Sequence, residues 1–108
     1  MFNENESSEG VEYRKYLSWS QNLETPPDVL RALTFHPNWF IRLSTAANPS
    51  TPKKTLQRMR ILDNAPEVRN MAKANLLLQD VSQRLREDRY MFGHLLKIHW
   101  MEEEASND

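Results

Sequence analysis

Residues 22–47 have the sequence NLETPPDVLRALTFHPNWFIRLSTAA and residues 48–74 have the sequence NPSTPKKTLQRMRILDNAPEVRNMAKA, so the second segment repeats the first. The pattern Asn-x-x-Thr-Pro returns after 26 residues, and the pair Ile41–Arg42 returns as Val68–Arg69 after 27 residues. A period of this length is typical of stacked helix pairs, because one pair cannot bury its apolar face alone. The chain is therefore predicted to contain two copies of one helical unit.

Each copy predicts a pair of short helices. The Thr-Pro dipeptides that begin at Thr25 and Thr51 start the first helix of each copy, since a threonine hydroxyl can cap a helix and proline fits the first helical position. Apolar residues follow at the spacing Leu-x-x-Leu or Leu-x-x-Met, and a proline-containing turn ends each helix. The second helices are expected at about residues 39–47 and 67–74.

Two further helices are predicted on either side of the repeats. Apolar residues at helical spacing predict one helix at about residues 10–20 and a longer one at about residues 79–99, with a kink or a boundary at Gly93. A stack of helix pairs exposes its core at both ends, so we expect these two helices to cap it. The predicted fold class is all-α: a short α-solenoid of about two helix-pair repeats with capping helices, which forms a single domain over residues 10–100.

The net charge of −1 hides an uneven distribution of charge. Residues 1–12 and 101–108 each carry four acidic side chains and no basic one, whereas residues 13–100 carry 14 basic and 7 acidic side chains. We expect a disordered acidic tail at residues 1–9 and a second acidic tail at residues 101–108. Such tails either shield the basic body from polyanions or are simply solvated ends.

Several classes of protein are disfavoured by the composition. The chain has no cysteine, which excludes disulfides and cysteine-based metal sites. No apolar run approaches the roughly 20 residues that span a bilayer, and the acidic N-terminus does not resemble a signal peptide. No catalytic motif or phosphate-binding glycine loop is present. We expect a cytoplasmic protein that is not an enzyme and has no cofactor and no metal site.

The repeated pattern resembles the leucine-rich repeat variant family, which is close in shape to HEAT-like helical repeats. The resemblance rests on Asn-x-x-Thr-Pro, Leu-x-x-Leu, a proline-containing break, Ile/Val-Arg and Ala-Asn, and it covers about half of the chain. It implies a right-handed superhelix in which longer and shorter helices alternate, with no catalytic activity. Some members carry a cysteine-bound iron–sulfur cluster, a feature that cannot be carried over to a chain without cysteine.

Large aromatic residues are the main candidates for contact with another protein, because tryptophan, tyrosine and arginine are enriched in binding hot spots. The predicted partner-binding residues are Trp39, Phe40, Arg42, Arg69, Tyr90 and Trp100. Two alternatives stay open. The repeated arginines Arg42 and Arg69 can instead bond carbonyls or a carboxylate of the next unit, and Trp100 can instead fold back onto the last repeat.

We therefore predict a protein-binding module, an adaptor, scaffold or small regulator or inhibitor of a larger protein, whose partner the sequence does not identify. The alternative is a nucleic-acid-binding helical repeat that uses a basic stripe, formed by Arg31, Lys53, Lys54 and Arg58. Self-association through the C-terminal helix is a further interaction that the apolar residues there allow.

Overall fold

The computed structural model describes the backbone of residues 8–106 and the side chains of residues 10–102. This part of the chain is all-helical, as predicted, and contains no strand. The helices are α1 (Ser8–Gln21), α2 (Pro27–Leu33), α3 (Trp39–Ala47), α4 (Lys53–Leu62) and α5 (Pro66–Ser106). The chain separates into two compact units, residues 1–77 and 78–108, where the sequence predicted one domain over residues 10–100.

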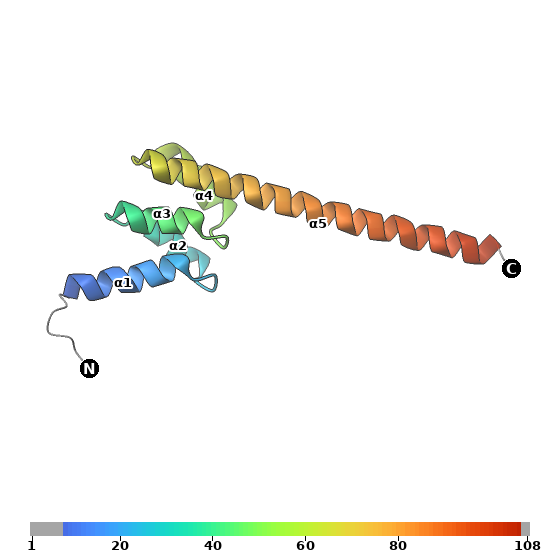
Figure 1. Ribbon diagram of the computed structural model, residues 1–108, viewed down its shortest axis with the longest axis horizontal. Coiled ribbons are helices and arrows are strands. Elements are labelled where there is room, and N and C mark those ends of the chain that lie inside the picture. Colours follow the sequence, from blue (N-terminus) through green and yellow to red (C-terminus); the bar gives the residue numbers. More distant parts are fainter. Residues whose placement is uncertain (1–7, 107–108) are drawn as a thin grey trace. The chain divides into compact units, whose positions relative to one another are not determined.

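The first compact unit, which we call the N-terminal unit, contains α1 to α4 and the first turns of α5. In Figure 1, α1, α3 and the start of α5 lie side by side, and α2 and α4 lie behind them. Both α1 and α2 contact α3. The four short helices therefore alternate between two layers, as a helix-pair repeat requires.

The core of the N-terminal unit is made by the residues that recur in the repeat. Leu30 of α2 and Ile41 of α3 are fully buried, and so are their counterparts Leu56 of α4 and Val68 of α5. Burial of each such side chain stabilises the fold by roughly 1.5–3 kcal/mol. One cluster connects α3, α4 and α5, and its buried members are Ala46, Leu56, Met59, Val68, Ala72 and Leu76.

Two buried asparagines, one at the start of the second repeat and one directly after it, bond to carbonyls of the preceding helix and turn. The Nδ2 atom of Asn48 donates to the carbonyls of Ser20 and Asn22, both at 2.9 Å. The Nδ2 atom of Asn75 donates in the same way to the carbonyls of Ala46 (2.8 Å) and Asn48 (2.9 Å). Both asparagines are almost fully buried, so the recurrence of Asn in the sequence reflects a repeated hydrogen bond between units.

The threonines of the Thr-Pro dipeptides have a different position from the one predicted. Pro26 and Pro52 occupy the N-cap positions of α2 and α4, so the prediction that Thr25 and Thr51 are the capping residues is wrong. The Thr25 hydroxyl donates to the carbonyl of Trp19 at 2.6 Å, and the Thr51 hydroxyl donates to that of Thr45 at 2.7 Å. Each threonine thus satisfies a carbonyl near the end of the preceding helix, where carbonyls lack intrahelical partners.

The C-terminal half of the chain departs from the predicted boundaries. The short helix expected at 67–74 and the longer one expected at 79–99 are one continuous helix, α5. Neither the predicted boundary between them nor a helix boundary at Gly93 is present. The physical reason is that no proline and no glycine lies between Pro66 and Gly93, so nothing in the local sequence ends the helix.

The predicted tails are partly helical. Helix α1 begins at Ser8, inside the expected disordered tail of residues 1–9, and α5 extends to Ser106, inside the expected tail of residues 101–108. The rest of both tails lies outside the described residues. The described side chains of residues 80–102 are all exposed, and the capping role predicted for this segment stays a prediction.

Candidate partner-binding surfaces

Arg42 is held inside the repeat by its guanidinium. Its Nη1 donates to the carbonyls of His36 (2.8 Å) and Pro37 (3.0 Å), and its Nε donates to Oδ2 of Asp63 at 2.9 Å. The Arg42 side chain is 12% exposed and that of Asp63 is 5% exposed. The structural alternative that the sequence left open is thus confirmed for Arg42, and its contact with a partner stays a prediction.

Arg69 occupies the equivalent position in the second repeat but has fewer bonds. Its Nη1 donates to the carbonyl of Asp63 at 2.7 Å, as Arg42 does to the carbonyl of His36, six residues back in each case. No described carboxylate bonds to Arg69, whereas Arg42 has Asp63. The repeat therefore explains one bond of Arg69, and its predicted contact with a partner stays open.

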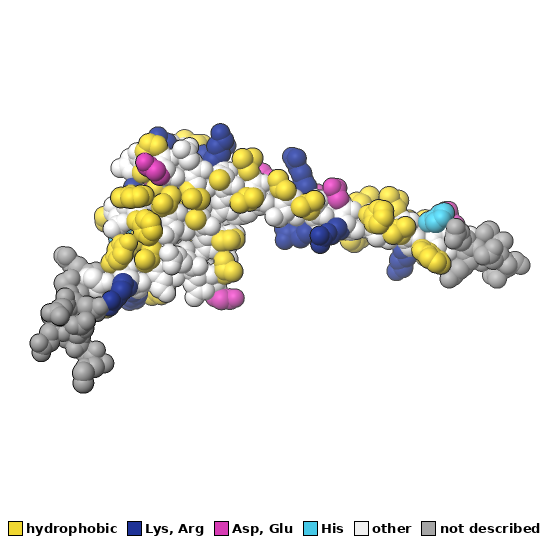
Figure 2. Space-filling view, in the orientation of Figure 1, with side chains coloured by type: hydrophobic (Ala, Val, Ile, Leu, Met, Phe, Trp, Pro, Cys, Tyr) yellow, Lys and Arg dark blue, Asp and Glu magenta, His cyan; other side chains and the backbone are white. Residues whose placement is uncertain are grey.

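Trp39 and Phe40 begin α3 and point outward. The side chains are 50% and 39% exposed, and their rings meet edge to face with centroids 5.8 Å apart. Asn38 starts the helix, because its Oδ1 accepts from the backbone N–H of Phe40 at 2.8 Å, and Ile41 anchors it in the core. Figure 2 shows hydrophobic side chains gathered at the left of the view, over the start of α3.

The repeat does not require these two aromatic side chains. At the shift of 27 residues that relates Arg42 to Arg69, Trp39 corresponds to Pro66 and Phe40 to Glu67. A structural residue recurs when the repeat needs it, as the buried asparagines do, whereas exposed aromatics in one copy only have no such role. Trp39 and Phe40 are therefore the strongest of the predicted partner-binding residues.

Tyr90 and Trp100 belong to the second compact unit, residues 78–108. They are 73% and 64% exposed, and the Tyr90 ring stacks on His94 with centroids 6.1 Å apart. Exposed apolar residues on α5 recur at the spacing of a coiled-coil seam, which is formed by Leu78, Val81, Leu85, Phe92 and Leu95. Self-association through this helix stays a prediction.

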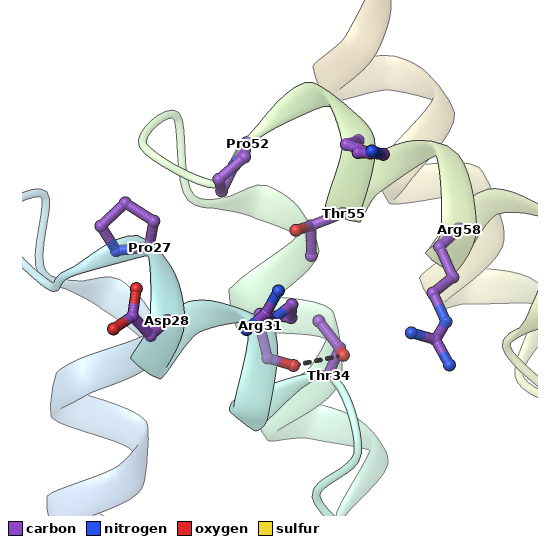
Figure 3. Close-up of a pocket in the computed structure, with 8 residues that line it drawn as sticks. Pro27, Asp28, Arg31, Thr34, Pro52, Thr55 and Arg58 are labelled. Atoms are coloured by element: carbon purple, nitrogen blue, oxygen red, sulfur yellow. Dashed lines mark hydrogen bonds between the residues drawn. The ribbon is translucent and has the colours of Figure 1, made fainter.

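A groove lies between α2 and α4. Its first part has a volume of about 510 Å³ and is lined by Pro27, Asp28, Arg31, Thr34, Pro52, Lys54, Thr55 and Arg58. Figure 3 shows Asp28 and Arg31 coming from α2, and Thr55 and Arg58 coming from α4. Three cations of the predicted basic stripe, Arg31, Lys54 and Arg58, therefore share one cavity, while Lys53 does not line it.

The groove continues past the ends of α2 and α4 into a second cavity of about 410 Å³. The two cavities are adjacent, because Thr34 and Arg58 line both of them, and together we call them the groove. The second part contains the exposed side chains of Phe35 and Leu62 and the Arg42–Asp63 pair. The Arg58 guanidinium lies over the Phe35 ring, with Cζ 4.8 Å from the ring centroid. We call the two parts the charged end and the apolar end.

The sequence pattern revealed the cations of this groove but missed its other residues. Arg31 and Lys54 lie on corresponding helices of neighbouring copies, which placed them together from the sequence. Asp28 and Phe35 were not among the predicted site residues, yet Asp28 lines the charged end and Phe35 is 62% exposed at the apolar end. The available signal was the shift of 26 residues, which aligns Asp28 with Lys54.

Two other kinds of feature, a metal site and a membrane-spanning helix, are absent from the described part of the chain. No three His, Asp or Glu side chains there lie close enough together to hold a metal ion. None of the described helices is both long enough and apolar enough to cross a membrane.

The comparisons with known proteins identify no relative. No model of a protein family matches the chain, and neither the curated proteins nor the solved structures contain a match.

Proposed function

We propose that the chain is a non-enzymatic protein-binding module, an adaptor, scaffold or small regulator of a larger protein. The observation that carries this proposal is the pair Trp39 and Phe40, which are exposed, meet edge to face and have no counterpart in the second repeat. Exposed aromatic clusters on a rigid helix are the usual anchors of protein interfaces. Arg42 and Arg69, Tyr90 and Trp100 complete the proposed set of contact residues.

We also propose that the N-terminal unit is a short α-solenoid related in design to the leucine-rich repeat variant family. The support is that the asparagine, threonine and arginine hydrogen bonds each recur after 26 or 27 residues. A helix-pair stack offers an extended surface without catalytic groups, which suits an adaptor.

Affinity capture from the native cell tests the proposed function. The full chain is used as bait beside the variant Trp39→Ala, with Leu23→Ala as the matched control because Leu23 is similarly exposed. We expect the control to retain a protein that the Trp39→Ala bait loses, since truncation of a hot-spot tryptophan costs about 2 kcal/mol or more of binding free energy. Equal capture by both variants contradicts a binding role for Trp39.

A second candidate function is nucleic-acid binding, favoured by the presence of Arg31, Lys54 and Arg58 in one groove. A contact with phosphates makes the affinity fall steeply with salt, because bound counterions are released. Titration of a labelled random duplex at increasing salt concentration tests this. Absence of binding at low salt eliminates the candidate.

A further inference from the structure

We propose that the groove between α2 and α4 binds an acidic segment of a partner protein in an extended conformation, with its carboxylates at the charged end and an apolar side chain at the apolar end. The inference rests on the proposed function, because it names the chemistry of the partner that such a module would take. Three observations support it.

The first observation is the uncompensated charge of the groove. Arg31, Lys54 and Arg58 form no ion pair with any residue that the structure describes, and Asp28 is the one acidic residue lining the charged end. The Arg58 Cζ atom lies 4.8 Å from the centroid of the Phe35 ring, and all three cations are exposed. The charged end therefore has an excess of two positive charges, available for carboxylates.

The second observation is that the repeat does not require these cations. At the shift of 26 residues, Arg31 corresponds to Gln57, Arg58 corresponds to Ala32, and Lys54 corresponds to Asp28. Arg42 and Arg69, by contrast, recur and bond backbone carbonyls of the repeat. The repeat therefore does not account for the groove cations, which leaves their side chains available to a ligand.

The third observation is the difference between the two ends of the groove. The charged end has three cations and one carboxylate, whereas at the apolar end Arg42 is paired with Asp63 and the side chains of Phe35 and Leu62 are 62% and 67% exposed; Arg58 lines both ends. A peptide can present carboxylates and an apolar side chain a few residues apart, whereas a phosphate backbone presents negative charge throughout.

Fluorescence anisotropy with a defined probe tests the proposal. The probe is a short, labelled peptide with two glutamates followed a few neutral residues later by a phenylalanine, and its matched control is the same peptide with glutamine for glutamate. The full chain is compared with the double variant Arg31→Glu/Arg58→Glu. The matched protein control is Arg60→Glu, because Arg60 is exposed on α4 but does not line the groove. Circular dichroism verifies that each variant is folded, and Lys54→Glu serves as a second groove variant.

We expect the glutamate probe to bind the wild type and the Arg60→Glu variant with similar affinity. Its affinity for the double variant should be lower by at least about tenfold. The glutamine peptide should bind more weakly than the glutamate peptide. A glutamate peptide with alanine in place of the phenylalanine should also bind more weakly than the original glutamate peptide. Equal binding of the two peptides, or an equal loss in the Arg60→Glu variant, overturns the proposal. Tighter binding of a duplex of matched charge also overturns it and assigns the groove to nucleic acid.

The failure of this inference is distinguishable from the failure of the proposed function. If the Trp39→Ala bait loses a captured protein while the groove variants retain it, protein binding stands and the groove has another role. If the probe binds in the groove but no protein is captured through Trp39, the acidic-peptide site stands and the aromatic anchor is wrong.

Discussion

The guanidinium of Arg42 and the carboxylate of Asp63 join the two turns that follow α2 and α4, at 2.9 Å between Nε and Oδ2. Asp63 is itself fixed, because its Oδ1 accepts from the backbone N–H of Ala65 at 2.9 Å. His36 has the equivalent position in the first repeat, and its Nδ1 accepts from the N–H of Asn38 at 3.0 Å. The same turn is thus stabilised by a histidine in the first copy and by an aspartate in the second copy. The aspartate, Asp63, also forms an ion pair with Arg42 of the first copy.

This ion pair predicts unequal effects for the same substitution at two equivalent arginines. Arg42→Lys removes the planar fork that bonds Asp63 and the carbonyls of the first turn, so we expect a loss of about 1.5–3 kcal/mol in the free energy of unfolding. Arg69→Lys is the matched control, because Arg69 has no described carboxylate partner, and we expect it to cost less than half as much. Urea unfolding measures both, and equal losses would show that the pair with Asp63 contributes little.

The buried asparagines predict a second asymmetry within the repeat. Asn48 is 3% exposed and donates to two carbonyls, whereas Asn22 at the start of the first repeat is exposed and only accepts from the N–H of Glu24. Asn48→Asp keeps the shape but removes the donor and places a carboxylate against carbonyl oxygens. We expect it to destabilise the fold by about 3 kcal/mol, and Asn22→Asp to change the stability by less than about 0.5 kcal/mol. Thermal unfolding that ranks the two variants in the reverse order would contradict this role of Asn48.

The repeat was predictable from the sequence because its determinants are local. Thr-Pro and the proline-containing turns fix where α2, α3 and α4 begin and end, and leucine spacing fixes their buried faces. The actual role of Thr25 was not predictable, because its partner is the carbonyl of Trp19 in the preceding helix. A threonine hydroxyl can accept from a backbone N–H of the following helix or donate to a carbonyl of the preceding helix. The packing of α1 places the Trp19 carbonyl within reach of Thr25 and decides between the two.

The length of α5 and the groove were harder to predict, for different reasons. The end expected after Ala74 was inferred from the first repeat, where Asn48 is followed by Pro49, but Asn75 is followed by leucine, so the helix continues. The groove depends on how α2 and α4 lie relative to each other. Sequence spacing therefore paired Arg31 with Lys54 and left the exposed Phe35 out.

Helix α5 predicts a steep change in amide protection along its length. Val68, Ala72 and Leu76 are buried, so amides near them should exchange only on opening of the N-terminal unit. The described side chains of residues 80–102 are all exposed, and an unpacked helix is marginally stable in water. Hydrogen exchange with mass spectrometry should show that the amides of residues 80–102 exchange at least about tenfold faster than those near Val68, Ala72 and Leu76. Uniform protection would contradict this and would indicate that a second copy covers the helix, which sedimentation would detect.

Gly93 offers a direct test of how α5 is stabilised beyond the N-terminal unit. An added Cβ at this position meets nothing within 4 Å, and the residue lies inside the helix without a positive φ angle. Gly93→Ala should therefore stabilise the local helix by about 1 kcal/mol, because alanine loses less backbone entropy on helix formation. We expect slower exchange of the surrounding amides and a higher helical signal in circular dichroism, with unchanged protection around Val68 and Ala72. A decrease in helicity would show that Gly93 permits a bend or a close contact that alanine prevents.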